Sequence, residues 1–309
     1  MAIKRIKIKD FLVFKSEFTI DFCPGVNVII GGNGTGKSTI LRAMYGRRDI
    51  IEMTELSEFA RAGSYRVERT EIEPLPYDDI KLVPFDELFD ATNFAYIPEK
   101  DVLEHSRGLL HFIETKLTGF GRVYKDVLLK AQDVPTANLS ITQQTLCKKL
   151  EGIMGGTVQY DMSDGCFYMV STDGKRIPFS HEASGFKKLG FLWLLIICGQ
   201  LEPGSVLFWD EPENSLNPEL VPLLVDILLE LSRNSVQIFV ATHSELLASY
   251  FAVNRVNMEE VLFISLYKEG DIVKANTGDR FDWLEPNNLT EEPVRLYEKK
   301  LDKGLGSNG

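Results

Sequence analysis

The chain has 309 residues, 44% of them hydrophobic, and a formal net charge of -11 at pH 7. It is long enough to bury a full core, as one large domain or two smaller ones. The negative charge disfavours general affinity for polyanions, so a nucleic-acid partner would need a local basic patch. The longest apolar run, residues 191–198, is far too short to cross a bilayer, and we expect no membrane segment. No secretory signal opens the chain, and its four cysteines lack paired spacing, so we expect a cytoplasmic protein with reduced thiols.

The first predicted element is a strand. The segment IKRIKIK alternates basic and apolar residues, which places most of its charges on one face. Lys4, Arg5, Lys7 and Lys9 form the densest basic patch of the chain. We interpret this patch as the solvated face of an edge strand, and a nucleic-acid surface is the less favoured alternative.

A glycine-rich segment follows, VNVIIGGNGTGKSTILRAMYG, which reads as a buried strand, a turn and a helix. Within it, residues 31–38 match G-x-x-x-x-G-K-[ST] at every fixed position. Glycine lets backbone N–H groups approach a phosphate chain, Lys37 can reach the β- and γ-phosphate oxygens, and the Ser38 hydroxyl can bind Mg²⁺. The pattern predicts an ATP site. Its predicted nucleotide-binding residues are Gly31, Asn33, Gly34, Gly36, Lys37, Ser38 and Thr39.

Residues 49–179 form a different region. Helices are predicted within residues 47–63 and 101–130, with a strand in TNFAYIPEKD between them. Residues 157–180 alternate around Asp164-Gly165 and Asp173-Gly174, which predicts a three-stranded meander. We interpret the region as a lid or partner-binding insertion, and structural elaboration is the equally weighted alternative.

The next segment, SHEASGFKKLGFLWLLIICG, predicts a buried helix with a polar start. Ser180 and Glu182 are expected to cap it, and Ser184 and Gly185 to present a hydroxyl and N–H groups to an anion.

Acidic residues follow the next predicted strand, VLFW. Because its carboxyl end would lie beside the phosphate loop, Asp210 is predicted to hold Mg²⁺, and Glu211 to orient or deprotonate the attacking water. A helix over residues 219–232 leads to the strand VQIFVAT, after which His243 is predicted to lie near the γ-phosphate. VLFISLY and DIVKA predict a final strand pair, followed by an amphipathic helix; the residues after His243 are too few for an added nuclease domain.

These motifs in this order resemble ABC-type ATPases. Residues 31–38, 183–187, 206–211 and 215–218, with His243, are similar to the Walker A, signature, Walker B, D-loop and switch histidine of that superfamily. The opening residues resemble its non-transporter branch of SMC-like, RecF-like and OLD-type ATPases. Phe186 replaces the second signature glycine, Glu99 stands where a Q-loop glutamine is expected, and no long coiled coil separates the motifs.

The resemblance implies an α/β fold, a P-loop NTPase with an ABC-type two-lobed head. The head would comprise residues 1–48 and 180–309, with N-terminal antiparallel strands and a parallel core sheet, and residues 49–179 would add the core-returning strand and a helical plus β-hairpin insertion. It also implies slow ATP hydrolysis by a head-to-tail homodimer, in which Ser184 and Gly185 of one copy cover the ATP of the other.

Three functions compete on this basis. The favoured one is a switch that controls a separate effector protein, in antiphage defence or DNA repair. The second is a DNA-binding repair or chromosome-maintenance ATPase. The third, the ATPase subunit of a membrane transporter, is disfavoured by the Ser-Gly-Phe signature.

Overall fold

The computed structural model describes residues 2–9, 11–45, 64–69, 94–101, 103–106, 108–109, 113 and 122–306. Its largest sheet has six strands in the order β12-β11-β3-β10-β9-β5. All of them are parallel except β12, which pairs antiparallel with β11 at one edge. The strands are β3 (Val26–Gly31), β5 (Phe94–Ile97), β9 (Val206–Asp210), β10 (Gln237–Thr242), β11 (Val261–Glu269) and β12 (Ile272–Gly278).

Two smaller antiparallel sheets accompany the large one. The first has the order β2-β1-β4 and the second β6-β7-β8. Their strands are β1 (Ile3–Lys9), β2 (Phe18–Asp21), β4 (Ser64–Arg69), β6 (Gly156–Asp161), β7 (Cys166–Ser171) and β8 (Arg176–Pro178). The prediction of an edge strand at the start of the chain was wrong, because β1 pairs with β2 on one side and β4 on the other.

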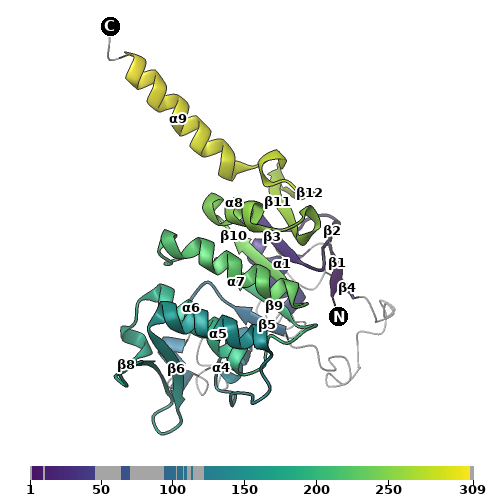
Figure 1. Cartoon of the computed structure of the whole chain (residues 1–309). Coiled ribbons are helices and arrows are strands. Elements are labelled where there is room, and N and C mark those ends of the chain that lie inside the picture. The colour runs from purple at the N-terminus through teal and green to yellow at the C-terminus, as the bar shows by residue number, and fades with distance from the viewer. Residues whose placement is uncertain are drawn as a thin grey trace.

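The helices pack in two groups. Figure 1 shows α7 and α8 side by side across the large sheet, and α5 and α6 together near β6. The helices are α1 (Lys37–Tyr45), α4 (Arg122–Ala131), α5 (Ile141–Met154), α6 (Ser184–Ile197), α7 (Val221–Arg233), α8 (Glu245–Asn254) and α9 (Asn288–Gly306). Short 3-10 turns are η3 (Leu103–His105), η4 (Phe179–His181), η5 (Pro218–Leu220), η6 (Met258–Glu260) and η7 (Phe281–Trp283).

The core explains why the central strands read as continuous apolar runs. Every residue of β3, β9 and β10 is buried. Parallel strands covered on both faces have no solvent side, so they lose the polar alternation that marks β1. Aromatic rings fill the space between layers, with Phe208 stacked on Phe239 at a centroid distance of 5.1 Å.

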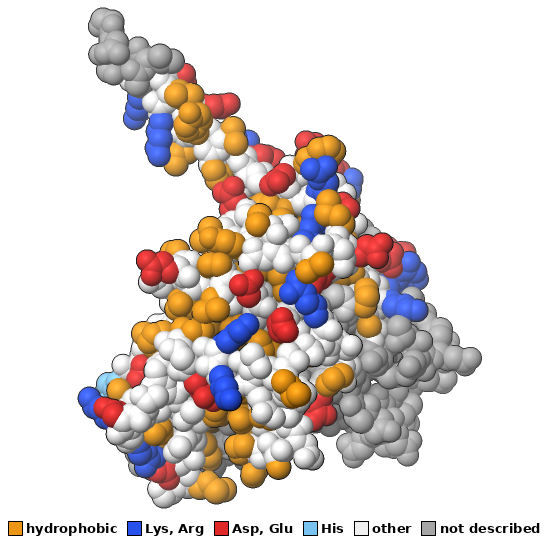
Figure 2. Space-filling model, viewed as in Figure 1, with side chains coloured by type: hydrophobic (Ala, Val, Ile, Leu, Met, Phe, Trp, Pro, Cys, Tyr) orange, Lys and Arg blue, Asp and Glu red, His pale blue; other side chains and the backbone are white. Residues whose placement is uncertain are grey.

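The C-terminal helix α9 projects away from the rest of the molecule (Figure 1). Residues 291–303 are all exposed. Apolar side chains, those of Val294, Tyr297 and Leu301 among them, lie on its surface between charged ones (Figure 2). None of the helices in the described part of the chain is long and apolar enough to cross a membrane.

The elements predicted for residues 49–179, between the two groups of ATP-binding motifs, are confirmed in part. The three-stranded meander is confirmed as β6, β7 and β8, and the returning strand as β5, which pairs with β9 in the large sheet. The helix predicted at 47–63 lies outside the described residues, and α4 confirms the end of the one predicted at 101–130. The division into a head and an insertion stays a prediction.

One buried amide ties β1 to the large sheet. Gln237, at the start of β10, is 2% exposed. Its Oε1 accepts a hydrogen bond from the Ile3 N–H at 2.7 Å, and its Nε2 donates to the carbonyls of Ile3 at 2.9 Å and Cys23 at 2.7 Å. A single side chain therefore satisfies three backbone groups of two segments that are more than 200 positions away.

We expect Gln237→Leu to lower the free energy of unfolding by about 2–4 kcal/mol, because the backbone groups that it leaves buried lose their partners. Urea denaturation of both proteins measures the change. Gln159→Leu, at an exposed position of β6, serves as the control and should cost less than about 1 kcal/mol. Equal losses in the two variants would contradict the role given to Gln237.

Candidate functional site

The glycine-rich loop connects β3 to α1 at the carboxyl edge of the large sheet. Gly31 has φ 149°, and a Cβ there would lie 2.4 Å from the Leu266 carbonyl oxygen. Gly36 has φ 97°, and its Cβ would lie 2.6 Å from the Phe14 ring. Both positions combine positive φ with a close neighbour, so a side chain at either would displace the loop. The fold therefore requires glycine at two of the motif positions.

Lys37 turns back into this loop. Its Nζ donates to the Gly31 carbonyl at 2.8 Å and to the Gly32 carbonyl at 3.3 Å. The side chain is buried, and burial lowers the pKa of Lys37 to about 8, although nearby carboxylates, that of Glu211 foremost, oppose the shift. A buried ammonium with only carbonyl partners is ready to take an anionic ligand.

The remaining predicted loop residues surround Lys37. Asn33 and Gly34 are exposed at the tip of the loop. Ser38 and Thr39 lie in the first turn of α1 and are half-buried. Backbone N–H groups at this helix start can bind phosphate oxygens, because they have no partner within the helix.

Asp210 ends β9 and meets the first turn of α1. Its Oδ1 accepts a hydrogen bond from the Ser38 hydroxyl at 3.1 Å, and its Oδ2 accepts one from the Tyr96 hydroxyl at 3.3 Å. Burial raises the pKa of Asp210, and the bond from Ser38 opposes the rise. A hydroxyl and a carboxylate that converge in this way are hard oxygen ligands of the kind that Mg²⁺ binds.

Glu211 follows in an uncommon backbone conformation, with φ 50°. Its N–H donates to the Ala241 carbonyl at 2.8 Å. Its Oε1 lies 3.3 Å from Nε2 of His243. Burial raises the pKa of the Glu211 carboxyl, and the neighbouring carboxylate of Glu99 adds to the effect. Burial lowers the pKa of His243, so at neutral pH its neutral imidazole can donate an N–H to Glu211.

Glu213 was not among the predicted site residues, yet its side chain holds the loop that carries His243. Its Oε1 accepts hydrogen bonds from the Thr242 hydroxyl at 2.5 Å and from the His243 N–H at 3.1 Å. Its Oε2 is buried and has no hydrogen-bond partner within the described part of the chain. These contacts span about thirty positions, so no local pattern reveals them.

Tyr96 and Arg42 were also missed. Tyr96 lies in β5 beside Phe208 of β9, and its buried hydroxyl donates to Asp210. The charge of Arg42 acts on both Tyr96 and Asp210. The register of β5 against β9 would have revealed Tyr96, because it places a tyrosine next to the strand that ends in Asp210.

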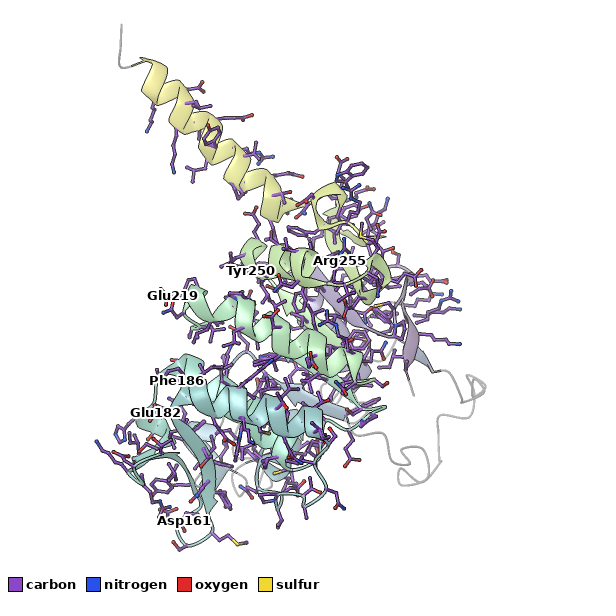
Figure 3. The ribbon with its side chains drawn as sticks, in the orientation of Figure 1. Asp161, Glu182, Phe186, Glu219, Tyr250 and Arg255 are labelled. Carbon is purple, nitrogen blue, oxygen red and sulfur yellow. The ribbon has the colours of Figure 1, made fainter. Side chains whose placement is uncertain are left out.

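The predicted signature residues start α6. The helix begins at Ser184, which is exposed, while Gly185 is buried against the Ser215 carbonyl and Leu216. The predicted caps were wrong: the N-cap position is Ala183, with no side-chain cap bond, and Ser180 belongs to η4. Figure 3 shows Glu182 and Phe186 at this helix start, on the same side of the molecule as Glu219 at η5.

The structure thus brings together Lys37, Ser38, Asp210, Glu211 and His243. Ser184 lies one helical turn before Lys188, whose Nζ donates to the Glu211 carbonyl at 2.5 Å. Glu99, the position examined for a Q-loop, is exposed at the end of β5, and its charge acts on Asp210 and Glu211.

Several known proteins are similar to this chain in sequence or in fold. A family model described as "AAA domain, putative AbiEii toxin, Type IV TA system" matches residues 137–249, and one described as "AAA domain" matches residues 5–45. The solved SMC head bound to the C-winged helix domain of ScpA superposes with a TM-score of 0.56 at 14% identity, over 90% of this chain and 98% of that one. The chain has the fold of an SMC/ABC-type P-loop ATPase head.

Two further relatives extend this finding. The SMC head with an extended coiled coil, bound to the C-terminal domain of ScpA derived from Pyrococcus furiosus, has a TM-score of 0.51 at 12% identity, over 96% of this chain and 98% of that chain. The structural maintenance of chromosomes protein 3 homolog of Plasmodium falciparum is 54% identical over 44 residues. That alignment spans 14% of this chain and 4% of the Plasmodium protein.

Lys37→Met tests the electrostatics of the site. Below pH 8 the folded and unfolded states both hold the lysine proton, so folding bears the cost of burying the charge. That cost is lost as the pH rises through the folded pKa of about 8 toward the higher unfolded value. We expect the stability of the variant relative to wild type to be greatest at pH 7 and to fall by about 1–3 kcal/mol by pH 10.

Denaturant unfolding at pH 7, 8.5 and 10 measures this difference. Lys148→Met, at an exposed position of α5, is the control and should give a difference that is flat with pH. A relative stability of Lys37→Met that rises with pH would show that Lys37 is not desolvated in the folded state.

Proposed function

We propose that this chain binds ATP and Mg²⁺, hydrolyses the ATP slowly, and acts as a cytoplasmic switch on a separate effector protein. The observation that carries the proposal is the convergence of Lys37, Ser38, Asp210, Glu211 and His243 at one edge of the sheet. The SMC/ABC-type fold supports it.

Each residue has a defined task in this proposal. The loop N–H groups and Lys37 bind the β- and γ-phosphates, for which Lys37 releases the Gly31 and Gly32 carbonyls. Ser38 and Asp210 would hold Mg²⁺, which offsets charge on the phosphates when it is bound.

The hydrolytic step depends on Glu211. Its carboxylate accepts a proton from the attacking water, and its raised pKa makes it a better base than an exposed glutamate. His243, held by Glu213 through its backbone N–H, orients Glu211 at 3.3 Å. A neutral imidazole has one N–H, so with ATP bound this N–H would turn from Glu211 to donate to the γ-phosphate.

We further propose that two copies form a head-to-tail sandwich. The exposed start of α6 supports this, because Ser184 presents a hydroxyl and helix N–H groups outward. In the sandwich this helix start covers the ATP bound by the other copy, so that each site takes residues from both chains.

For the effector, a protein partner has more support than DNA. The SMC heads with this fold were solved with ScpA bound. The basic residues of β1 are partly neutralised: Arg5 forms an ion pair with Asp21, whose charge Lys7 also reaches. We propose antiphage defence as the process, in keeping with the toxin–antitoxin description of the matched family model, and DNA repair as the alternative.

Glu211→Gln should bind ATP and slow its hydrolysis by about 100-fold or more. It should accumulate as a dimer with ATP and Mg²⁺, because the ATP-bound dimer separates only after hydrolysis. Light scattering with and without nucleotide, repeated with short duplex DNA, measures the mass. Glu259→Gln, in η6 before the amino end of β11, is exposed and should behave as wild type. A Glu211→Gln protein that stays monomeric with ATP would contradict the sandwich.

Ser184→Arg tests the composite site from the other side. We expect the isolated chain to bind ATP with wild-type affinity while its turnover falls by about tenfold or more, because the bulky side chain blocks the other copy. Mixing it with the inactive Lys37→Met variant should restore part of the activity, since one site of the mixed dimer is then intact. No recovery on mixing would show that the site does not take residues from both chains.

A further inference from the structure

Two adjacent lysines of α6 are buried. Lys187 and Lys188 are each 6% exposed. Lysine is rarely buried to this extent, because its charge must then be matched by partners within the protein. Lys187 is the last residue of the segment that resembles the signature, and Lys188 lies just outside it.

The two side chains serve different partners. Lys187 forms an ion pair with Glu104 and lies 3.4 Å from the Ser180 carbonyl, away from the phosphate loop. Lys188 donates instead to the backbone carbonyl of Glu211 at 2.5 Å. Its ammonium also interacts with the charges of four carboxylates of the site, those of Glu213, Glu211, Glu99 and Asp210. Of the two lysines, only Lys188 thus contacts the residues of the candidate ATP site.

The contact matters because of the conformation of Glu211. A positive φ of 50° is uncommon for a residue with a side chain and persists only where the surroundings fix it. The Glu211 N–H donates to the Ala241 carbonyl, and the Glu211 carbonyl accepts hydrogen bonds from the Asn214 N–H at 3.1 Å and from Lys188. Removing Lys188 leaves this carbonyl with the Asn214 turn bond and without the bond that connects the Glu211 turn to α6.

The same helix reaches the other half of the proposed sandwich. Lys188 lies one turn after Ser184, and Gly185 packs on the backbone of Ser215 and Leu216, just after the Glu211 turn. A shift of the Glu211 backbone therefore acts on α6 at two places, through the Lys188 hydrogen bond and through the Gly185 contact.

We propose that Lys188 is a positioning residue: it holds the Glu211 backbone in the reactive conformation and transmits nucleotide binding in one site to the start of α6, which serves the other. This inference rests on the proposed ATPase function. In the proposed sandwich, each chain contributes Glu211 to one ATP site and Ser184 to the other. Lys188 would connect these two contributions within one chain.

The experiment compares Lys188→Met and Lys188→Arg with Lys130→Met. Methionine keeps the length and apolar body of lysine, and Lys130, in α4, also donates to a backbone carbonyl, that of Phe94, but lies outside the motifs of the site. Unfolding of each variant is measured first. Turnover, ATP affinity and amide hydrogen exchange over residues 184–190 are then measured with MgATP.

We expect Lys188→Met to lower kcat by about tenfold or more while KM and ATP affinity change by less than about threefold. The ATP-induced change in exchange at the start of α6 should be lost in Lys188→Met and kept in Lys130→Met. Lys188→Arg, which retains a donor, should recover part of both signals.

The outcomes separate this inference from the function on which it rests. A wild-type chain that binds no MgATP would overturn the proposed function before any variant is compared. If wild type responds to MgATP, then a Lys188→Met protein with unchanged exchange response, or a Lys130→Met protein with the same loss of kcat, would overturn the role of Lys188 alone.

Discussion

The parallel register of β10 with β3 and β9 determines which residues meet at the carboxyl edge of the large sheet, where the candidate ATP site lies. Thr242 of β10 lies opposite Ile30 of β3, and Ala241 lies opposite Asp210 of β9. The next residues of each strand, Gly31, His243 and Glu211, therefore leave the sheet side by side. A slip of one residue in either pairing would exchange the two faces of the strand and separate these groups.

This register also determines the electrostatics of the site. The carboxylates of Asp210, Glu211 and Glu213 gather around the buried ammonium groups of Lys37 and Lys188. Negative charge surrounds the position where phosphates would bind under the proposed function, and a divalent cation bound with them would offset part of the repulsion. An uncompensated charge is costly in a buried site, so the proposed nucleotide and cation would bind together.

Much of this arrangement could be predicted from the sequence because it is encoded locally. The phosphate loop follows from the glycines and lysine of residues 31–38, and Asp210 and Glu211 follow from their place after an apolar strand. Contacts made by pairing distant strands could not be predicted in this way. Tyr96 reaches Asp210 from a strand more than a hundred positions earlier, and Lys188 reaches a backbone carbonyl, which carries no side-chain signature. The edge assignment of β1 failed for the same reason, since its second neighbour, β4, comes from a segment without a clear strand pattern.

The projecting helix α9 has a consequence for how the molecule moves in solution. At 1.5 Å per residue, its 19 residues extend for about 28 Å, comparable to the diameter of a small domain. An arm of this length adds frictional drag with little mass, so a single copy diffuses as a larger particle than its 34.9 kDa implies. Elution volume then reports the arm as much as the number of chains, whereas scattered light reports mass alone.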